Sequence, residues 1–291
     1  MDELTVKALG KINLGLDVVR KREDGYHEVR MIMQTVHLYD MLTIKKRQET
    51  GVHLTTNLNF LPVNEDNLCV KAAQMLIDEF QLEHGVDMSL KKRIPVAAGM
   101  AGGSTDAAAV LYGMNRIYDL GLSRQQLMER GVKIGADVPY CLMRGTALAE
   151  GIGEKLSPLP PMVKCPILIA KPSISVSTKY VYEHLDLQNE ANHPDIDALI
   201  TDISNSDLHG IARDMGNILE TVTVTKYPVI EEIKQVMKNH GALASMMSGS
   251  GPTVFGLFED DKSLERAKQA LHESGLCNRI HGTTIYNNRR A

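Results

Sequence analysis

Residues 95–107 read Pro-Val-Ala-Ala-Gly-Met-Ala-Gly-Gly-Ser-Thr-Asp-Ala, and this stretch decides the fold more than any other part of the chain. Gly99, Gly102 and Gly103 accept positive φ angles and carry no Cβ, and the neighbouring alanines add little bulk. A large anion can therefore approach the main chain closely, with backbone N–H groups as its ligands. The stretch predicts a loop that holds phosphate.

An amphipathic helix is expected directly after this loop. Ser104, Thr105 and Asp106 are residue types that favour the N-cap position. Apolar residues then recur at helical spacing and predict a helix buried on one face only: Ala107, Val110, Leu111, Met114 and Ile117 or Tyr118. The N-terminus of such a helix offers unpaired N–H groups and the positive end of the helix dipole, which favour a di- or triphosphate.

The loop matches neither of the two commonest glycine motifs for nucleotides. A Walker A loop needs Gly-x-x-x-x-Gly-Lys-Ser/Thr, and no lysine stands at that place. A dinucleotide fingerprint needs Gly-x-Gly-x-x-Gly, which Gly99-x-x-Gly102-Gly103 does not supply. The alternative is a tight turn that uses glycine only for its geometry, but a turn needs fewer small residues than this run contains.

Composition and charge restrict the class of protein. A chain of 291 residues suits one large domain or two ordinary ones, and two are expected. The net charge of −4 argues against a nucleic-acid partner, and the basic runs at 45–47 and 91–93 are expected at solvated strand ends. The four cysteines are widely spaced, which indicates neither a zinc site nor a disulfide framework. No signal peptide and no membrane-spanning run are recognisable, so a cytoplasmic protein without a membrane partner is expected.

Strand patterns dominate the first hundred residues. Apolar and polar residues alternate at 4–9, 11–20, 28–39, 41–46, 52–57 and 86–92. A helix that Asp66 or Asn67 can cap interrupts them, and Ser123 with Gln126 predicts a capping box for another helix. A tight turn at 135–139 and one or two strands through 150 are expected next. Prolines and glycines cluster at 151–166 and predict an irregular connection, so the domains are expected at 1–157 and 158–291.

The second domain is expected to be a smaller α+β unit. Strands are predicted at 167–170, 242–247, 253–258 and 279–286, and helices at 177–186, 195–211, 213–223, 228–240 and 262–274. Two strands joined by a short loop between two helices predict a small antiparallel sheet that is covered on one side. The whole chain is therefore assigned to the α+β class.

Three polar segments can carry chemistry because they lie at strand ends or turns. They are Lys11-Ile12-Asn13, Gly25-Tyr26-His27 and Gly135-Ala136-Asp137-Val138-Pro139. Lys11 and Asn13 are two residues apart on a strand and therefore share a face. Each segment also has a plain structural explanation: Lys11 as a charge at the rim of a sheet, Tyr26 as a turn residue packed on its own strand, and Asp137 as a turn former.

These segments, taken in chain order with the glycine-rich loop and with Met247-Ser248-Gly249-Ser250-Gly251, resemble the GHMP small-molecule kinases. The resemblance covers nearly the whole chain. It implies an N-terminal domain like ribosomal protein S5 and a ferredoxin-like C-terminal domain, with the active site in the cleft between them. Two departures are that Leu9-Gly10 precede Lys11 where the family often has Pro-Ala, and that Ala97, Ala98 and Met100 stand where other members carry glycine or leucine.

The resemblance also implies the roles of single residues. Asp137 would accept the proton of the substrate hydroxyl, and Lys11 would keep Asp137 ionised and stabilise the developing charge, which suits phosphoryl transfer. Magnesium is expected with ATP, but no set of acidic metal ligands is recognisable, and only the hydroxyls of Ser104 and Thr105 are candidates for contact with metal or phosphate. The residues expected to hold ATP are Pro95, Val96, Ala97, Ala98, Gly99, Met100, Ala101, Gly102, Gly103, Ser104 and Thr105.

The substrate implied is a small alcohol that carries a cytidine diphosphate group, because Lys11-Ile12-Asn13 with Asp24-Gly25-Tyr26-His27-Glu28 resembles the members that phosphorylate such a compound. Its cytosine would stack between Tyr26 and Tyr182, with His27, Asn13 and Thr178 as further contacts. The alternatives are a GHMP kinase for mevalonate, homoserine or a sugar, and an inactive ligand sensor on the same fold. A monomer or a homodimer is expected.

Overall fold

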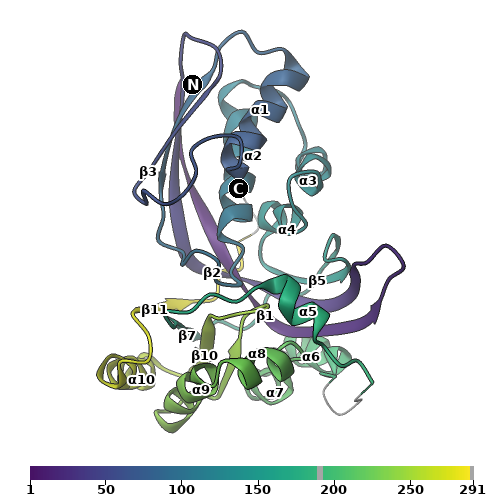
Figure 1. Cartoon of the computed structure of the whole chain (residues 1–291), viewed down its shortest axis with the longest axis vertical. Coiled ribbons are helices and arrows are strands. Elements are labelled where there is room, and N and C mark those ends of the chain that lie inside the picture. The colour runs from purple at the N-terminus through teal and green to yellow at the C-terminus, as the bar shows by residue number, and fades with distance from the viewer. Residues whose placement is uncertain (189–192, 289–291) are drawn as a thin grey trace. The chain divides into compact units, whose positions relative to one another are not determined.

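The computed structural model describes residues 1–188 and 193–288 of the chain. Their contacts form two compact units. The first unit contains residues 1–10, 38–96 and 101–143, and the second contains residues 11–37, 97–100 and 144–291. Two long strands, β1 (Glu3–Lys21) and β2 (His27–Lys46), each run from one unit into the other (Figure 1). The polar segment that starts at Lys11 therefore belongs to the second unit.

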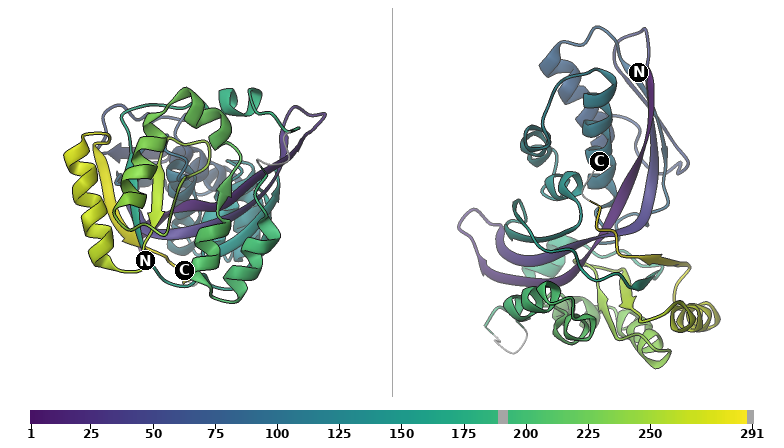
Figure 2. Two further views of the ribbon diagram at one scale, coloured as in Figure 1. Left: turned by 90° about the horizontal axis from the view of Figure 1, so that it is seen from below. Right: turned by 180° about the vertical axis from the view of Figure 1, so that it is seen from behind.

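The first unit is a sheet covered by helices. Strand β4 (Val86–Lys91) pairs in parallel with β3 (Val52–Thr56) and antiparallel with the last residues of β2. The helices lie on one side of these strands (Figures 1 and 2). They are α1 (Leu68–Phe80), α2 (Gly102–Ile117), α3 (Arg124–Val132) and α4 (Val138–Met143), and α2 packs against the other three.

The second unit contains the small antiparallel sheet that the sequence predicts. Its strands lie in the order β11 (Arg279–Thr284), β7 (Pro166–Lys171), β10 (Val254–Leu257) and β9 (Ala244–Met247). Helix α9 (Val229–Asn239) packs against β9 and β10, and α10 (Asp261–Ser274) packs against β7 and β11 (Figure 2). The loop at 248–253 joins the two adjacent strands β9 and β10.

The remainder of the second unit surrounds the N-terminal strands. Strand β5 (Thr146–Gly151) pairs with β2 and with β6 (Lys155–Pro158), and β8 (Gly216–Asn217) pairs in parallel with β1. The helices of this part are α5 (Thr178–Glu183), α6 (Ile196–Ser204), α7 (Leu208–Asp214) and α8 (Glu220–Lys226). No helix in the described ranges is both long and apolar enough to cross a membrane. The mixture of sheets and helices confirms the predicted α+β class.

Two helix starts are confirmed at the residue level. The side chain of Asn67 accepts a hydrogen bond of 2.9 Å from the N–H of Cys69 and caps α1. Ser123 and Gln126 form the predicted capping box of α3, in which each side chain bonds to the other residue's backbone. Such caps are local, because donor and acceptor lie within three residues of each other.

Several predicted boundaries are wrong. The breaks expected at Gly10 and Asp40 are absent, since β1 and β2 run through both residues. Helix α4 occupies 138–143, where a strand was expected, and β6 lies within the stretch predicted to be irregular. The helix predicted at 195–211 is divided into α6 and α7, because Ser206 between them has a φ of 56°.

The start of α2 also differs from the prediction. Its N-cap is Ala101, which has a φ of 55° and no side-chain cap, whereas Ser104, Thr105 and Asp106 lie inside the first two turns. The reason is that two of these side chains bind elsewhere: Thr105 Oγ1 donates to the carbonyl oxygen of Leu9 at 2.8 Å, and Asp106 bonds to Lys92. The helix is not buried on one face only, since every residue from 105 to 111 is buried.

Candidate active site

The backbone of the glycine-rich loop alternates in handedness. The φ angle is positive at Ala97 (49°), Gly99 (69°) and Ala101 (55°), but not at the two residues between them. A left-handed conformation is uncommon for alanine and costs free energy, so it is kept only where the surroundings enforce it. Successive N–H groups in such an alternating backbone form a concave site for anions. This geometry supports the prediction that the loop holds phosphate rather than forming a simple turn.

Gly99 is held closely against the loop that follows β9. A Cβ on Gly99 would lie 2.0 Å from the carbonyl oxygen of Ser248, so no other residue fits without moving the backbone. The Ser248 hydroxyl donates a hydrogen bond of 2.9 Å to the carbonyl oxygen of Gly99. On the other side, the N–H of Lys11 donates to the carbonyl oxygen of Met100 at 3.2 Å. The loop segment 97–100 is therefore fixed by two other parts of the second unit.

In the first unit, the N-terminus of α2 offers backbone donors. The first intrahelical bond runs from the N–H of Thr105 to the carbonyl oxygen of Ala101 at 2.8 Å, so the N–H groups of residues 102–104 have no acceptor within the helix. No described side chain caps this end. A Cβ on Gly102 would lie 3.3 Å from both Ile94 and the ammonium group of Lys92, so a larger residue would crowd these two side chains. The helix start suits an anion.

A buried charged cluster lies beneath this helix start, and the sequence does not predict it. The ammonium group of Lys92 bonds to the carboxylates of Asp40 and, at 2.6 Å, of Asp106, and the three side chains are 4% exposed or less. Asp40 also accepts hydrogen bonds from the N–H groups of Arg93 and, at 2.8 Å, of Ile94. The expectation that Lys92 belongs to a solvated strand end is therefore wrong.

Burial governs the protonation of this cluster. It raises the pKa of Asp106 well above its ordinary value, although the neighbouring Lys92 acts in the opposite direction. Burial also disfavours the charged form of Lys92, but the carboxylates of Asp106 and Asp40 outweigh it and raise the pKa of Lys92. Asp106 Oδ1 is buried and has no hydrogen-bond partner among the described residues. Burial thus favours the protonated form of Asp106, whereas the two carboxylates favour the charged form of Lys92.

Lys11 and Asn13 form a polar pair inside the second unit. Their side chains share a face of β1 as predicted, and Lys11 Nζ donates to Asn13 Oδ1 at 2.7 Å. Lys11 is only 5% exposed and Asn13 is fully buried, so the interpretation of Lys11 as a rim charge is wrong. The Asn13 amide donates in turn to the sulfur of Met31 at 3.3 Å. A buried ammonium group is costly, and its presence favours a functional role.

Asp137 lies in a turn of the first unit, directly before α4. The turn is closed by a hydrogen bond of 3.1 Å from the N–H of Val138 to the carbonyl oxygen of Gly135, and the backbone of Asp137 accepts from Cys141. A Cβ on Gly135 would lie 3.9 Å from the Ser104 hydroxyl. The turn that carries Asp137 is thus close to the first turn of α2. Asp137 is both a turn former and half-buried beside the predicted phosphate site.

The aromatic residues expected to contact the base lie in the second unit. Tyr26 is 61% exposed, so it is not packed on its own strand and that alternative is wrong. Asp24 accepts a hydrogen bond from the N–H of Tyr26 at 3.1 Å and shapes the turn between β1 and β2. Tyr182 on α5 contacts the ring of His27, with 5.1 Å between ring centroids. Burial, followed by the charge of Lys21, lowers the pKa of His27.

Thr178 connects α5 with the loop after β9. Its hydroxyl and that of Ser250 are 2.8 Å apart and form a hydrogen bond. The residues predicted for substrate and the loop that contacts Gly99 are therefore linked within the second unit. The sequence gives no signal for this link, because the two hydroxyls are 72 residues apart.

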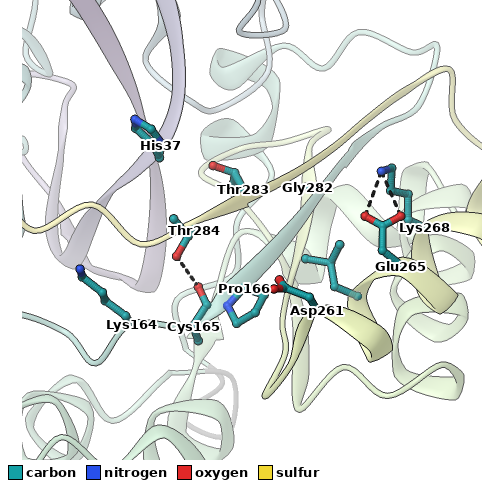
Figure 3. Close-up of a pocket in the computed structure, with 11 residues that line it drawn as sticks. His37, Lys164, Cys165, Pro166, Asp261, Glu265, Lys268, Gly282, Thr283 and Thr284 are labelled. Atoms are coloured by element: carbon teal, nitrogen blue, oxygen red, sulfur yellow. Dashed lines mark hydrogen bonds and ion pairs between the residues drawn. The ribbon is translucent and has the colours of Figure 1, made fainter.

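A cavity lies elsewhere in the second unit. Figure 3 shows it beside the N-terminal turn of α10 and strands β7 and β11, with His37 of β2 at its edge. Its volume is about 610 Å³, and none of the predicted site residues lines it. Within residues 1–188 and 193–288, His, Cys, Asp and Glu side chains form no cluster of three or more that could hold a metal ion.

Comparisons with known proteins agree with this geometry. A family model described as the GHMP kinases N-terminal domain matches residues 67–145, and one described as GHMP kinases C-terminal matches residues 196–276. A protein of Lachnospira eligens named 4-diphosphocytidyl-2-C-methyl-D-erythritol kinase is 54% identical over 286 residues, which are 98% of this chain and 99% of that protein. A protein of the same name from Alkaliphilus metalliredigens is 45% identical over 291 residues, covering 100% and 99% of the two chains.

Solved structures show the same fold. A crystal structure of 4-(cytidine 5′-diphospho)-2C-methyl-D-erythritol kinase matches with a TM-score of 0.85 and 30% identity, covering 98% of this chain and 100% of that one. Homoserine kinase from Cytophaga hutchinsonii matches with a TM-score of 0.79 and 20% identity, covering 100% and 96%. The second likeness concerns the fold alone.

Proposed function

The chain belongs to the GHMP kinase family, and we propose that it transfers the γ-phosphate of ATP to the 2-hydroxyl group of 4-diphosphocytidyl-2-C-methyl-D-erythritol. This reaction belongs to the non-mevalonate pathway of isoprenoid precursor synthesis. The observation that carries the proposal is the identity of 45–54% with kinases of this name over almost the whole chain. Lys11, Asn13 and Tyr26 to His27 are the residues that distinguish this substrate from those of other members.

Two structural features fit the triphosphate of ATP. The alternating backbone of residues 97–101 presents N–H groups, and the start of α2 adds those of residues 102–104. Small residues keep both surfaces accessible: a Cβ at Gly99 would clash with the Ser248 carbonyl, and one at Gly102 would crowd Ile94 and Lys92. We therefore assign residues 95–105 to ATP.

Magnesium accompanies ATP in phosphoryl transfer and neutralises charge on the β- and γ-phosphates. Thr105 is buried and its hydroxyl donates to the carbonyl oxygen of Leu9, so this hydroxyl binds the protein backbone. The Ser104 hydroxyl is the remaining candidate on this turn for contact with phosphate or metal. The donor set available is a hydroxyl with phosphate oxygens, which suits a hard cation such as Mg²⁺.

The chemistry assigned to the protein is positioning and charge stabilisation. The substrate oxygen attacks the γ-phosphorus, the bond from that phosphorus to the bridging oxygen of ADP breaks, and Asp137 receives the hydroxyl proton. Lys11 is a fixed cation, because it is buried and bonded to Asn13, and it stabilises the negative charge that develops during transfer. Both residues act on the reacting atoms, so they are the catalytic residues of the proposal.

Recognition of the cytosine base is assigned to the aromatic residues of the second unit. The exposed ring of Tyr26 is available for stacking, and Tyr182 is held by its contact with His27. Asn13 and Thr178 supply polar groups within the same unit. A small molecule is thus the partner of this surface.

We also propose a domain boundary at 157, since the two family models, at 67–145 and 196–276, fall on either side of it. The compact units follow a different division, because residues 11–37 cluster with the C-terminal part of the chain. The enzyme is proposed to act in the cytoplasm as a monomer or a homodimer, which size-exclusion chromatography with light scattering would distinguish.

A panel of acceptors tests the function. The purified protein is incubated with magnesium, ATP and one of four alcohols: the diphosphocytidyl methylerythritol, mevalonate, homoserine or galactose. We expect ADP release only with the first. Turnover with only one of the other alcohols would show that the proposed substrate is wrong but that the protein is a kinase. Nucleotide binding without turnover on any acceptor would favour a ligand sensor.

A further inference from the structure

Asn217 is a buried amide whose hydrogen bonds all go to backbone groups. It forms the end of β8 and is 8% exposed. Its Nδ2 donates to the carbonyl oxygens of Met247 at 2.9 Å and Gly249 at 2.8 Å, and its Oδ1 accepts from the N–H of Leu219 at 3.0 Å. The single side chain therefore joins β8 to the loop that follows β9.

Glu220 also binds Met247, the last residue of β9 before the loop. Its Oε1 accepts a hydrogen bond of 2.6 Å from the N–H of Met247, and its Oε2 accepts one of 2.7 Å from Lys234. Lys234 is itself only 8% exposed, and its ion pair with Glu220 keeps that carboxylate in place. Asn217 and Glu220 thus bind both backbone groups of Met247.

The loop fixed in this way is the one that contacts the glycine-rich segment. Ser248 lies between the two residues that Asn217 binds, and its hydroxyl donates to the carbonyl oxygen of Gly99. The carbonyl oxygen of Ser248 would lie only 2.0 Å from a Cβ on Gly99. Because the two backbones are in close contact and hydrogen-bonded, a shift of Ser248 either displaces Gly99 or breaks its bond to Gly99. These contacts all lie within the second unit.

We propose that Asn217, supported by Glu220, is a positioning residue for ATP: it fixes the loop at 247–249 and thereby the left-handed backbone at Gly99. This inference rests on the proposed function, since it takes the segment at 97–100 as the phosphate loop. The side chain of Asn217 bonds to Leu219, Met247 and Gly249, not to residues 97–100. Its effect on nucleotide binding is therefore transmitted through Ser248.

Asn217→Asp tests the proposal with little change of shape. The substitution replaces two N–H donors by an oxygen that faces two carbonyl oxygens, so the loop loses its anchor. We expect Mg·ADP to bind about 10-fold more weakly in calorimetry, and KM for ATP to rise by a similar factor, since a tenfold change follows from one unsatisfied buried group. KM for the alcohol is expected to stay within about twofold.

Asn239→Asp is the matched control. Asn239 ends α9 at the surface, where its side chain accepts a hydrogen bond of 2.7 Å from Gln235. This variant is expected to bind Mg·ADP like the wild type. A merely structural role of Asn217 would lower the melting temperature and the active fraction but leave the affinity of the folded protein for ADP unchanged, and that result would overturn the proposal.

Ser248→Ala decides the question if Asn217→Asp does not fold. It removes one hydroxyl and the bond to Gly99, and we expect about threefold weaker binding of Mg·ADP, in keeping with a single hydrogen bond. Wild-type affinity in this variant would overturn the inference. If the wild-type protein itself bound no Mg·ADP, the proposed function would fall and the inference with it, so the two failures are distinguishable.

Discussion

The hydroxyl of Ser248 donates a hydrogen bond of 2.9 Å to the carbonyl oxygen of Gly99, although the two residues are 149 positions apart in the chain. The bond joins the loop between β9 and β10 to the glycine-rich loop. Since a Cβ on Gly99 would meet the Ser248 backbone, the pair also explains why glycine is required there. Two segments that look independent in the sequence therefore form one structure.

Gly99→Ala is expected to abolish ATP binding. The new methyl group would have to displace the Ser248 carbonyl, and the left-handed backbone that presents the N–H groups would be lost. Gly275→Ala is the control, because Gly275 is also left-handed, with a φ of 67°, but has open space where a Cβ would be placed. That variant should lose about 1–2 kcal/mol of stability and keep its ADP affinity. Equal ADP affinity in both variants would contradict the loop assignment.

Asp137→Asn should lower kcat by about 10²- to 10⁴-fold, the usual contribution of a group that accepts a proton in the transition state. The Kd for Mg·ADP should stay near that of the wild type, because Asp137 is not assigned to the nucleotide. Single-turnover kinetics and calorimetry measure the two quantities separately. Near-normal turnover would show that another group receives the proton.

Lys11→Met tests the buried cation. The substitution keeps most of the side-chain volume but removes the charge and the donor to Asn13, so turnover should fall by orders of magnitude while ADP still binds. Lys91→Met, at an exposed lysine on β4, should behave as the wild type. A loss of activity that matched only a loss of folded protein in circular dichroism would count against a catalytic role.

Tyr26→Ala should raise KM for the alcohol substrate more than it lowers kcat. Base stacking on an aromatic ring contributes about 1–3 kcal/mol, which corresponds to roughly 5- to 150-fold in affinity. Tyr26→Phe retains the ring and should stay close to the wild type. Because Tyr26 is 61% exposed, neither variant should change the melting temperature much. If the alanine variant had an unaltered KM, the base would have to be bound elsewhere.

Lys92→Met should destabilise the first unit in a pH-dependent manner. Without the lysine, Asp40 and Asp106 are left as an uncompensated buried pair, a loss of about 3–5 kcal/mol at a pH above the folded-state pKa of Asp106. The pKa of Asp106 is already raised by burial, so its favourable contribution is present below the ordinary Asp value of about 4 and disappears as the pH rises through its folded-state pKa. The deficit in urea unfolding should therefore shrink toward acidic pH. A deficit that did not vary with pH would mean that Asp106 is not the group responsible.

Local features of the fold could be predicted from the sequence, but long-range ones could not. The cap at Asn67 and the capping box at Ser123 depend only on neighbouring residues. Gly10 and Asp40 resemble strand breaks, yet both strands continue. A Cβ on Gly10 would lie 3.3 Å from the Ile94 side chain, so glycine gives that side chain space. The Asp40 carboxylate accepts a hydrogen bond from the N–H of Ile94, 54 residues away.

The same distinction holds for the candidate site. The glycine-rich loop and the polar strand at Lys11 were recognisable because their residue types are unusual in those positions. Lys92 and Asn217 were not, since their roles depend on partners 52 and 30 residues away for which no local pattern exists. Asp106 was interpreted as a helix cap, whereas burial beside Lys92 determines its role.

The most direct test of the account is the position of the phosphate in the product. The protein is incubated with ATP, magnesium and 4-diphosphocytidyl-2-C-methyl-D-erythritol, and the product is examined by ³¹P and ¹³C NMR. We expect a new phosphate monoester whose phosphorus couples to C2 of the methylerythritol, formed by the wild type and nearly absent with Asp137→Asn. A phosphate on another hydroxyl, or no transfer from ATP under conditions where Mg·ADP binds, would contradict it.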